Sequence, residues 1–485
     1  MPRTYLLSRW LFLRLLGVVY LIAFASLAVQ ITGLVGEHGL LPAGPFLDWA
    51  HSIYGHRAYR LFPTLFWLGA GDSVLQLAAW AGVVFSIVLM LGVAPGPLLA
   101  LLWALYLSLT VVGQGFLSFQ WDALLLEAGL LAALWAPFRW RRGAAEAPPS
   151  NAIRWLLVLL LFKLMFLSGA TKLLSGDPTW RSLTALDYHF ETQPLPTWLA
   201  WYAHQLPPGV HRLATATMFV VELAAPWLLL APPRLRVLRL AGCAALVLFQ
   251  LGIALTGNYG FFNLLAIVLC VPVLDDDFLR RVLPVKLSAG ERPPAGRRVA
   301  VGLLAPVLLC LSALSFGAEI AYTLPGGRGA ALLPRWAATV LGWVAPLRSF
   351  NGYGLFRVMT TERPEIVVEG SRDGTHWQAY EFRYKPGPVN RRPGFVAPYH
   401  PRLDWQMWFA GLDPMGNWDW LESLARHLRA GTPEVLALLG RDPFAGAPPR
   451  AIRFARYDYR FSTPAERART GAWWVRELTG YLPPP

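Results

Sequence analysis

The chain has 485 residues and carries too little charge for a soluble protein of its size. Hydrophobic residues make up 55% of the sequence and charged residues 15%, whereas a typical soluble domain is about 25% charged. This composition excludes a disordered chain, a coiled coil and an ordinary cytosolic enzyme. We therefore predict an integral membrane protein whose first partner is the lipid bilayer.

The net charge of +14 raises the question of nucleic-acid binding. The cations are spread over short loops and a tail, and no basic run is long enough to follow a phosphate backbone. We therefore expect no nucleic-acid partner. The three cysteines all lie in apolar stretches, so they indicate no disulfide framework.

Nine apolar windows of suitable length are candidates for membrane spans. We therefore predict that residues 1–322 form an all-α polytopic membrane bundle of about nine transmembrane helices, with long outer loops at 33–72 and 172–212. The windows are 10–32, 73–93, 96–113, 117–137, 152–171, 213–231, 237–256, 260–274 and 299–322.

Cations in the short loops predict the orientation of this bundle. They lie before the first window and after the fourth, sixth and eighth, which with nine spans is one side of the membrane. The positive-inside rule makes that side cytoplasmic, so the long loops and the C-terminal region would face a periplasm or the ER lumen. Arginine-rich usage favours a bacterial inner membrane over an endoplasmic reticulum membrane. The cations are Arg3, Arg9, Arg139, Arg141, Arg142, Arg234, Arg236, Arg280, Arg281, Lys286, Arg292, Arg297 and Arg298.

Residues 351–485 have the composition of a soluble domain. We predict a strand at 366–370, a second strand from Trp377 to Tyr384 after an Asp-Gly turn, and a late strand at 450–461. Helices are expected near 403–412, 417–429 and 432–440. The result would be an extramembrane α+β or β-sandwich-like domain, joined to the bundle by an interfacial connector at 323–350.

Three charged residues lie about halfway along their predicted spans. They are Glu127, Lys163 and Glu222, and charge at this depth costs roughly 2.5–3.5 kcal/mol per group. We expect them to form one buried cluster. The cluster would either be a structural ion pair that fixes helix packing or part of a path for a proton or substrate.

The densest set of polar residues lies in the outer loop that begins near residue 172. Asp177 is expected to cap a short helix that starts at Pro178. Lys172, Asp177, Asp187, His189 and His204 could form an acid–base set. However, the sequence contains no nucleophile elbow, phosphate loop or metal-ligand spacing, so we expect no metal and no cofactor.

Several long stretches resemble the lipase maturation factor family. They are Ser168–Trp180 with its continuation through Leu183–His189 to Gln193–Pro196, then Phe119–Glu127, Asn351–Met359 and Pro401–Phe409. The resemblance implies a multi-pass membrane protein, in animals one of the ER, that helps secreted lipases to fold and assemble into active dimers. It also implies that the extramembrane region contacts the client.

We therefore expect a membrane-embedded maturation or assembly factor for secreted lipases or other exported proteins, more in keeping with a chaperone-like role than with an enzyme. The alternative is a membrane enzyme that acts on a lipid or lipid-linked substrate at the outer face. Trp, Tyr and Arg are the usual anchors of recognition faces. The candidate client- or ligand-binding residues are Lys172, Asp177, Trp180, Asp187, Tyr188, His189, Gln193, His204, Asn351, Tyr353, Arg402, Asp404, Trp405 and Gln406.

Overall fold

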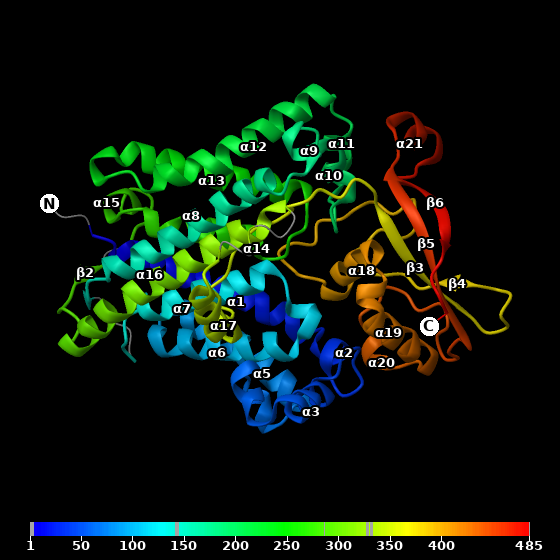
Figure 1. Ribbon diagram of the computed structural model, residues 1–485, viewed down its shortest axis with the longest axis horizontal. Coiled ribbons are helices and arrows are strands. Elements are labelled where there is room, and N and C mark those ends of the chain that lie inside the picture. Colours follow the sequence, from blue (N-terminus) through cyan, green and yellow to red (C-terminus); the bar gives the residue numbers. More distant parts are fainter. Residues whose placement is uncertain (1–3, 141–144, 286, 326–328, 330–332, 485) are drawn as a thin grey trace.

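The chain forms a helix bundle with a C-terminal domain at one end (Figure 1). The computed structural model describes residues 4–140, 145–285, 287–325, 329 and 333–484. Four of the loop cations used to predict orientation lie outside the described residues: Arg3, Arg141, Arg142 and Lys286.

Among the described residues, seven helices are long and apolar enough to cross a membrane. They confirm a polytopic helical bundle. These helices are α1 (Leu6–Ala28), α5 (Asp72–Met90), α6 (Pro95–Val112), α8 (Asn151–Leu174), α12 (Pro208–Leu229), α13 (Arg236–Thr256) and α16 (Ala295–Thr323).

The other two predicted windows form shorter helices. The window at 117–137 becomes α7 (Gln120–Trp135), which has 16 residues. The window at 260–274 contains α14 (Phe262–Val268), which has 7 residues. Because a helix rises about 1.5 Å per residue, α7 is roughly 24 Å long and falls short of the ~30 Å hydrocarbon core. Helix α7 packs inside the bundle against α6 and α8 instead.

At the end of the bundle away from the C-terminal domain, segments that are far apart in the sequence contact one another (Figure 1). The short strands β1 (Ala145–Glu146) and β2 (Ser288–Ala289) pair in parallel. Asp276, in the short helix α15 (Asp276–Leu279), accepts hydrogen bonds from the backbone N–H groups of Leu6 and Leu7 at 2.9 and 2.8 Å. Asp276 therefore supplies acceptors that the first turn of α1 lacks.

Short helices cap the opposite end of the bundle. The segment between α1 and α5 contains α2 (Ile31–Val35), α3 (Ala43–Tyr54) and α4 (Ala58–Leu61). The loop that follows α8 contains α9 (Pro178–Arg181), α10 (Leu186–Thr192) and α11 (Trp198–His204). Helix α17 (Arg335–Val344) precedes the C-terminal domain and exposes Trp336 and Trp343.

The C-terminal domain is built on one four-stranded antiparallel sheet in the order β4-β3-β5-β6. The strands are β3 (Pro364–Ser371), β4 (Gln378–Ala379), β5 (Ala451–Phe461) and β6 (Trp474–Tyr481). The α+β class is confirmed, with a single sheet rather than a sandwich. Of the strand expected at 377–384, two residues pair with β3 as β4 and Glu381 forms an isolated bridge with Arg441, and β6 was not predicted.

Three helices lie between this sheet and the bundle (Figure 1). They are α18 (Arg402–Leu412), α19 (Trp418–Ala430) and α20 (Pro433–Leu436). Helix α18 contacts both β3 and the 3-10 turn Gln114–Leu117 of the bundle, and α20 contacts α2. A last helix, α21 (Pro464–Thr470), begins in a capping box formed by Thr463 and Glu466.

Candidate functional site at the junction of the two domains

A buried ion pair joins the C-terminal domain to the bundle. Arg402, at the start of α18, donates two hydrogen bonds to the carboxylate of Asp122 in α7, at 2.9 and 2.8 Å. The two side chains are 1% and 0% exposed. Burial alone would lower the pKa of Arg402, but Asp122 raises it above its ordinary value. A two-bond fork of this kind is among the strongest charge-assisted contacts in proteins.

Aromatic rings pack around this ion pair. The rings of Phe119 and Trp121 stack with centroids 4.9 Å apart, and His400 meets them edge-on at 4.7 and 5.0 Å. Trp405 lies 4.8 Å from Trp121. Burial and the positive charge of Arg402 lower the pKa of His400 well below its ordinary value. Two of the stretches that resemble the lipase maturation factor family therefore meet at this point.

Glu127 joins α7, α8 and the start of the C-terminal domain. Its Oε1 accepts a hydrogen bond from Lys163 Nζ at 2.6 Å, and its Oε2 accepts one from the Tyr353 hydroxyl at 2.7 Å. The backbone N–H of Asn351 donates to the same Oε2 at 3.2 Å. Two candidate residues from the tail therefore surround a carboxylate of the bundle.

The expected cluster of Glu127, Lys163 and Glu222 is divided in the structure. Glu222 accepts hydrogen bonds from Lys172 Nζ at 2.8 and 2.7 Å rather than from Lys163. The two lysines are nine residues apart in α8, which places them on opposite helix faces and about 13.5 Å apart along the axis. The side chain of Lys172 also lies 5.3 Å from the ring of Trp180.

Asp177 holds the C-terminal domain as well as its own helix. Its Oδ1 accepts from the Thr179 N–H at 2.7 Å, which confirms the predicted cap, and its Oδ2 accepts from the Met359 N–H at 2.7 Å. Burial raises the pKa of Asp177, but these hydrogen bonds outweigh that effect and lower it below its ordinary value. The Trp180 indole donates to the carbonyl of Phe356 at 3.0 Å.

The remaining polar side chains of this loop have separate partners. Asp187 pairs with His211 at 2.8 Å, and His204 lies 3.5 Å from a carboxylate oxygen of Glu191. The candidates Lys172, Asp177, Asp187, His189 and His204 therefore do not converge on one reacting position. Among the described residues, no group of three or more His, Cys, Asp or Glu is placed to hold a metal ion.

His189 lies at the partly exposed end of a chain of hydrogen bonds whose other members, Tyr259 and Gln193, are buried. The Tyr259 hydroxyl donates to Gln193 Oε1 at 2.8 Å and lies 3.3 Å from His189 Nε2. Burial, with a smaller contribution from the charge of Lys172, lowers the pKa of His189 to about 4. The imidazole is therefore neutral in the folded protein near pH 7.

Lowering the pH should destabilise the protein through His189. The unfolded chain takes up a proton near pH 6.5, whereas the folded chain does so only near pH 4, so stability present above pH 6.5 is lost as the pH falls toward 4. The loss should reach about 3 kcal/mol for this group. Denaturant titrations in detergent at pH 7 and 4.5 should show a smaller pH effect for His189→Gln. If His189→Gln loses as much unfolding free energy between pH 7 and 4.5 as wild type does, His189 is not the source of the pH effect. The variant His51→Gln, at an exposed histidine, serves as control.

Arg363 joins the C-terminal domain to the loop that carries His189. Its guanidinium donates to the carbonyl oxygens of Glu191, Gln193 and Pro194 and pairs with Glu365 at 2.8 Å. The two remaining candidates of the tail, Asp404 and Gln406, have other partners. Asp404 Oδ1 accepts from the Tyr384 and Lys385 N–H groups at 2.8 Å within the C-terminal domain, and Gln406 donates to the Gly115 carbonyl of the bundle.

The candidate recognition residues therefore mostly form a buried junction. Trp180 and Trp405, the aromatic anchors, are only 2% and 3% exposed. The other buried candidates are Lys172, Asp177, Gln193, Tyr353, Arg402, Asp404 and Gln406, whereas Asp187, Tyr188, His189, His204 and Asn351 are partly exposed. Nothing in the structure tests the client-binding role of these fourteen residues, which stays a prediction; direct contact by the buried ones would need a different conformation.

Several buried residues of the junction were not among the candidates. On the bundle side they include Phe119, Trp121 and Asp122, and the others include Tyr259, Arg363 and His400. Tyr259 and its neighbour Asn258 are polar residues between the apolar windows 237–256 and 260–274, and His400 immediately precedes a stretch that resembles the family. Those positions could have identified these two residues. Arg363 has no comparable signal, because its three acceptors are backbone carbonyls.

One exposed patch of aromatic and cationic side chains borders the junction. We define the aromatic patch as Trp198, Tyr202, Arg392, Phe395 and Arg467. Trp198 lies 6.0 Å from both Tyr202 and Phe395, and Arg467 lies 5.7 Å from the ring of Tyr202. Tyr202 and Phe395 are 48% and 49% exposed. The patch therefore combines α11 of the outer loop with two parts of the C-terminal domain.

Comparison with known proteins covers both parts of the chain. The model of the lipase maturation factor transmembrane domain matches residues 7–281, and the model of the lipase maturation factor C-terminal domain matches residues 349–484. Human lipase maturation factor 2 is 37% identical over 97% of this chain and 81% of its own length. No solved structure matches the chain significantly.

Bovine lipase maturation factor 1 is also similar, at 36% identity over 99% of this chain and 89% of its own length. The mouse lipase maturation factor 1 is 34% identical over 99% of this chain and 87% of its own length. The matched regions include the buried junction on both of its sides, and nothing in the site or the relatives supports the enzyme alternative. This multi-pass membrane protein belongs to the lipase maturation factor family.

Proposed function

We propose that the protein is a membrane-embedded maturation factor that assists the folding of a secreted lipase or another exported client. The observation that carries the proposal is similarity to proteins named lipase maturation factor along nearly the whole chain. The junction supports it, because its buried ion pairs and rings hold the C-terminal domain rigidly on the bundle. A rigid support presents a binding surface without a large ordering cost.

The client contact in this proposal is the aromatic patch. Exposed Trp, Tyr and Arg side chains are the residues most enriched in binding hot spots. Tyr202 and Phe395 are both about half exposed, and they come from opposite sides of the junction. The buried candidates, including Trp180 and Trp405, would position this patch rather than touch the client.

Replacing Tyr202 and Phe395 together by serine should abolish client maturation without unfolding the protein. Both side chains are exposed, so little buried surface is lost, whereas removal of two hot-spot aromatics should weaken client binding by roughly tenfold or more. The experiment expresses each variant with a secreted lipase in cells that lack their own maturation factor. Secreted lipase activity is then measured beside the melting temperature of the purified variant.

The matched control is Trp49→Ser with Tyr59→Ser, which removes two exposed rings from the first outer loop. It should retain wild-type lipase activity. Wild-type chain that fails to raise lipase activity would overturn the proposed function. Equal activity of wild type and the patch variant would overturn only the assignment of the client contact.

We propose that the N-terminal end of the bundle faces the cytoplasm and that the C-terminal domain faces the periplasm of a bacterium or the ER lumen of a eukaryote. The loop cations described here support this orientation through the positive-inside rule. In a chain with Cys310→Ser, an impermeant maleimide should label Met415→Cys from the outer or lumenal side of the intact membrane. Arg281→Cys should react only after permeabilisation, and the reverse pattern would refute the orientation.

A further inference from the structure

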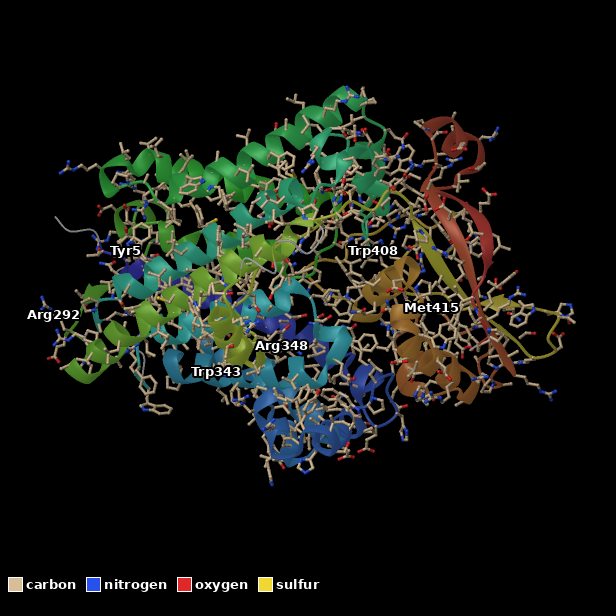
Figure 2. All side chains as sticks on the ribbon, viewed as in Figure 1. Tyr5, Arg292, Trp343, Arg348, Trp408 and Met415 are labelled. Carbon is tan, nitrogen blue, oxygen red and sulfur yellow. The ribbon has the colours of Figure 1, made fainter. Side chains whose placement is uncertain are left out.

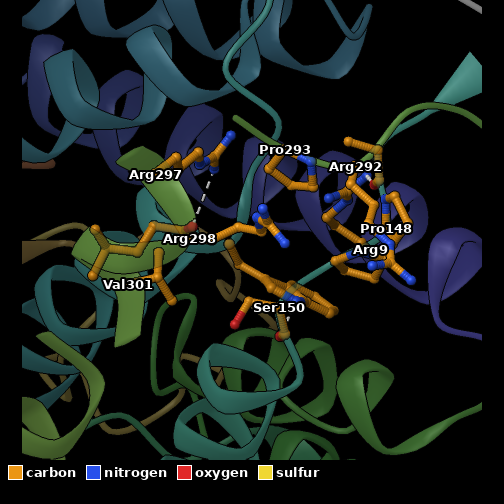
Figure 3. A pocket seen from close by; sticks show the side chains of 12 residues that line it. Arg9, Pro148, Ser150, Arg292, Pro293, Arg297, Arg298 and Val301 are labelled. Carbon is orange, nitrogen blue, oxygen red and sulfur yellow. Dashed lines mark hydrogen bonds between the residues drawn. The ribbon is translucent and has the colours of Figure 1, made fainter. Parts of the chain in front are cut away.

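A basic cavity, shown from close by in Figure 3, lies at the end of the bundle where Figure 2 labels Arg292. Its volume is about 330 Å³, and it is lined by parts of α1, α7, the segment before α8 and the start of α16. Figure 2 places Tyr5 and Arg292 at this end and Trp408 at the other. The cavity is therefore remote from the junction and from the aromatic patch.

Four arginines line the cavity, and their charge is only partly neutralised. They are Arg9, Arg292, Arg297 and Arg298. Arg9 pairs with Glu146 at 2.8 Å, and Arg297 donates to the carbonyls of Leu134 and Ala136, which carry no net charge. None of the described side chains that line the cavity is acidic.

Arg292 and Arg298 are the two cations available to a ligand. Both are exposed, and neither side chain makes a hydrogen bond or ion pair with any residue that the structure describes. Nε of Arg9 is also buried without a partner in the described chain. Arginine binds phosphate through a planar fork of N–H donors, so this set favours a phosphate group as the missing partner.

The other wall of the cavity is apolar, and helix α16 exposes further apolar side chains on its other side. Trp135 and Val301 line the cavity. On the face of α16 away from Val301, Val299, Leu303 and Val307 are 61%, 70% and 54% exposed and follow one another at four-residue spacing. A basic cavity beside a helix with this much exposed apolar surface fits a ligand with an acyl chain better than a free anion.

We propose that the cavity binds the phosphate headgroup of an anionic phospholipid, whose acyl chains extend over the exposed apolar surface of the bundle beside α16. Basic pockets between membrane helices are well suited to such headgroups. Arg292 and Arg298 hold the phosphate, while Arg9 and Arg297 are fixed by contacts within the bundle and add positive potential. The site is separate from the proposed client contact, and it does not depend on that assignment.

The test compares lipid binding to the full-length protein in detergent by native mass spectrometry. The ligands are phosphatidylglycerol, phosphatidylcholine and inorganic phosphate. Wild type should bind phosphatidylglycerol most tightly. The variant Arg292→Gln with Arg298→Gln should bind it about 25-fold more weakly, since each cation near an anionic lipid contributes roughly fivefold. Lysine at both positions should restore part of the affinity, because the charge returns without the fork.

The matched control, Arg234→Gln with Arg281→Gln, removes two exposed loop cations outside the cavity and should bind like wild type. Equal weakening in the control, or equal binding of phosphatidylglycerol and phosphatidylcholine, would overturn the proposal. Inorganic phosphate that binds as tightly as phosphatidylglycerol would overturn the lipid assignment and leave a site for free phosphate. A melting temperature close to that of wild type verifies that each variant is folded.

Discussion

Replacing Arg402 by methionine should destabilise the folded protein by about 3–5 kcal/mol, the usual cost of removing one member of a buried ion pair. The Asp122 carboxylate, which is 0% exposed, would lose both of its guanidinium donors. It would retain the hydroxyl of Tyr106 as a donor. The carboxylate must then be buried uncompensated or take up a proton, and either outcome costs stability.

The measurement is the free energy of unfolding in detergent, with limited proteolysis to detect release of the C-terminal domain. The matched control is Arg441→Met, because the side chain of Arg441 is 69% exposed and its ion pair with Glu381 should contribute under about 1 kcal/mol. In the double variant of Arg402→Met and Asp122→Leu, the loss should be smaller than the sum of the single losses. Wild-type stability of Arg402→Met would contradict the view that this ion pair holds the junction.

Replacing Lys163 by methionine should cost a similar amount, about 3–5 kcal/mol. The side chains of Lys163 and Glu127 are 3% and 5% exposed, and their atoms lie 2.6 Å apart. Without the ammonium group, Glu127 would keep only neutral donors from Tyr353 and Asn351. Because Glu127 also holds the start of the C-terminal domain, the loss should affect both parts of the protein.

Expression level and melting temperature measure this effect. Ser315→Ala is the matched control, since it removes a neutral hydroxyl, with its 3.4 Å contact to Lys163 and its 2.9 Å bond to the Ser312 carbonyl, and should change stability by about 1 kcal/mol. Glu127→Gln combined with Lys163→Met should recover part of the loss. Normal expression and melting of Lys163→Met would reject the structural role and favour a path for protons or substrate.

Local sequence signals predicted much of the fold. Long apolar windows identified the seven long helices, because a span must satisfy its backbone hydrogen bonds within itself. Local alternation located β3 and β5 to within two residues of their ends. Local sequence signals were weaker where an element forms only by pairing with another part of the chain. Edge strand β6 depends on pairing with β5.

The membrane class and the long helices were determined by the sequence alone, because each depends on composition or on short stretches. Which charge meets which was decided only by the tertiary structure. Arg402 and Asp122 are 280 residues apart, and Lys172 rather than Lys163 pairs with Glu222. Ion pairing acts over a few ångströms in space and leaves no local pattern. The burial of Trp180 and Trp405 likewise depends on which distant segments pack against them, and this packing leaves no pattern in the nearby sequence.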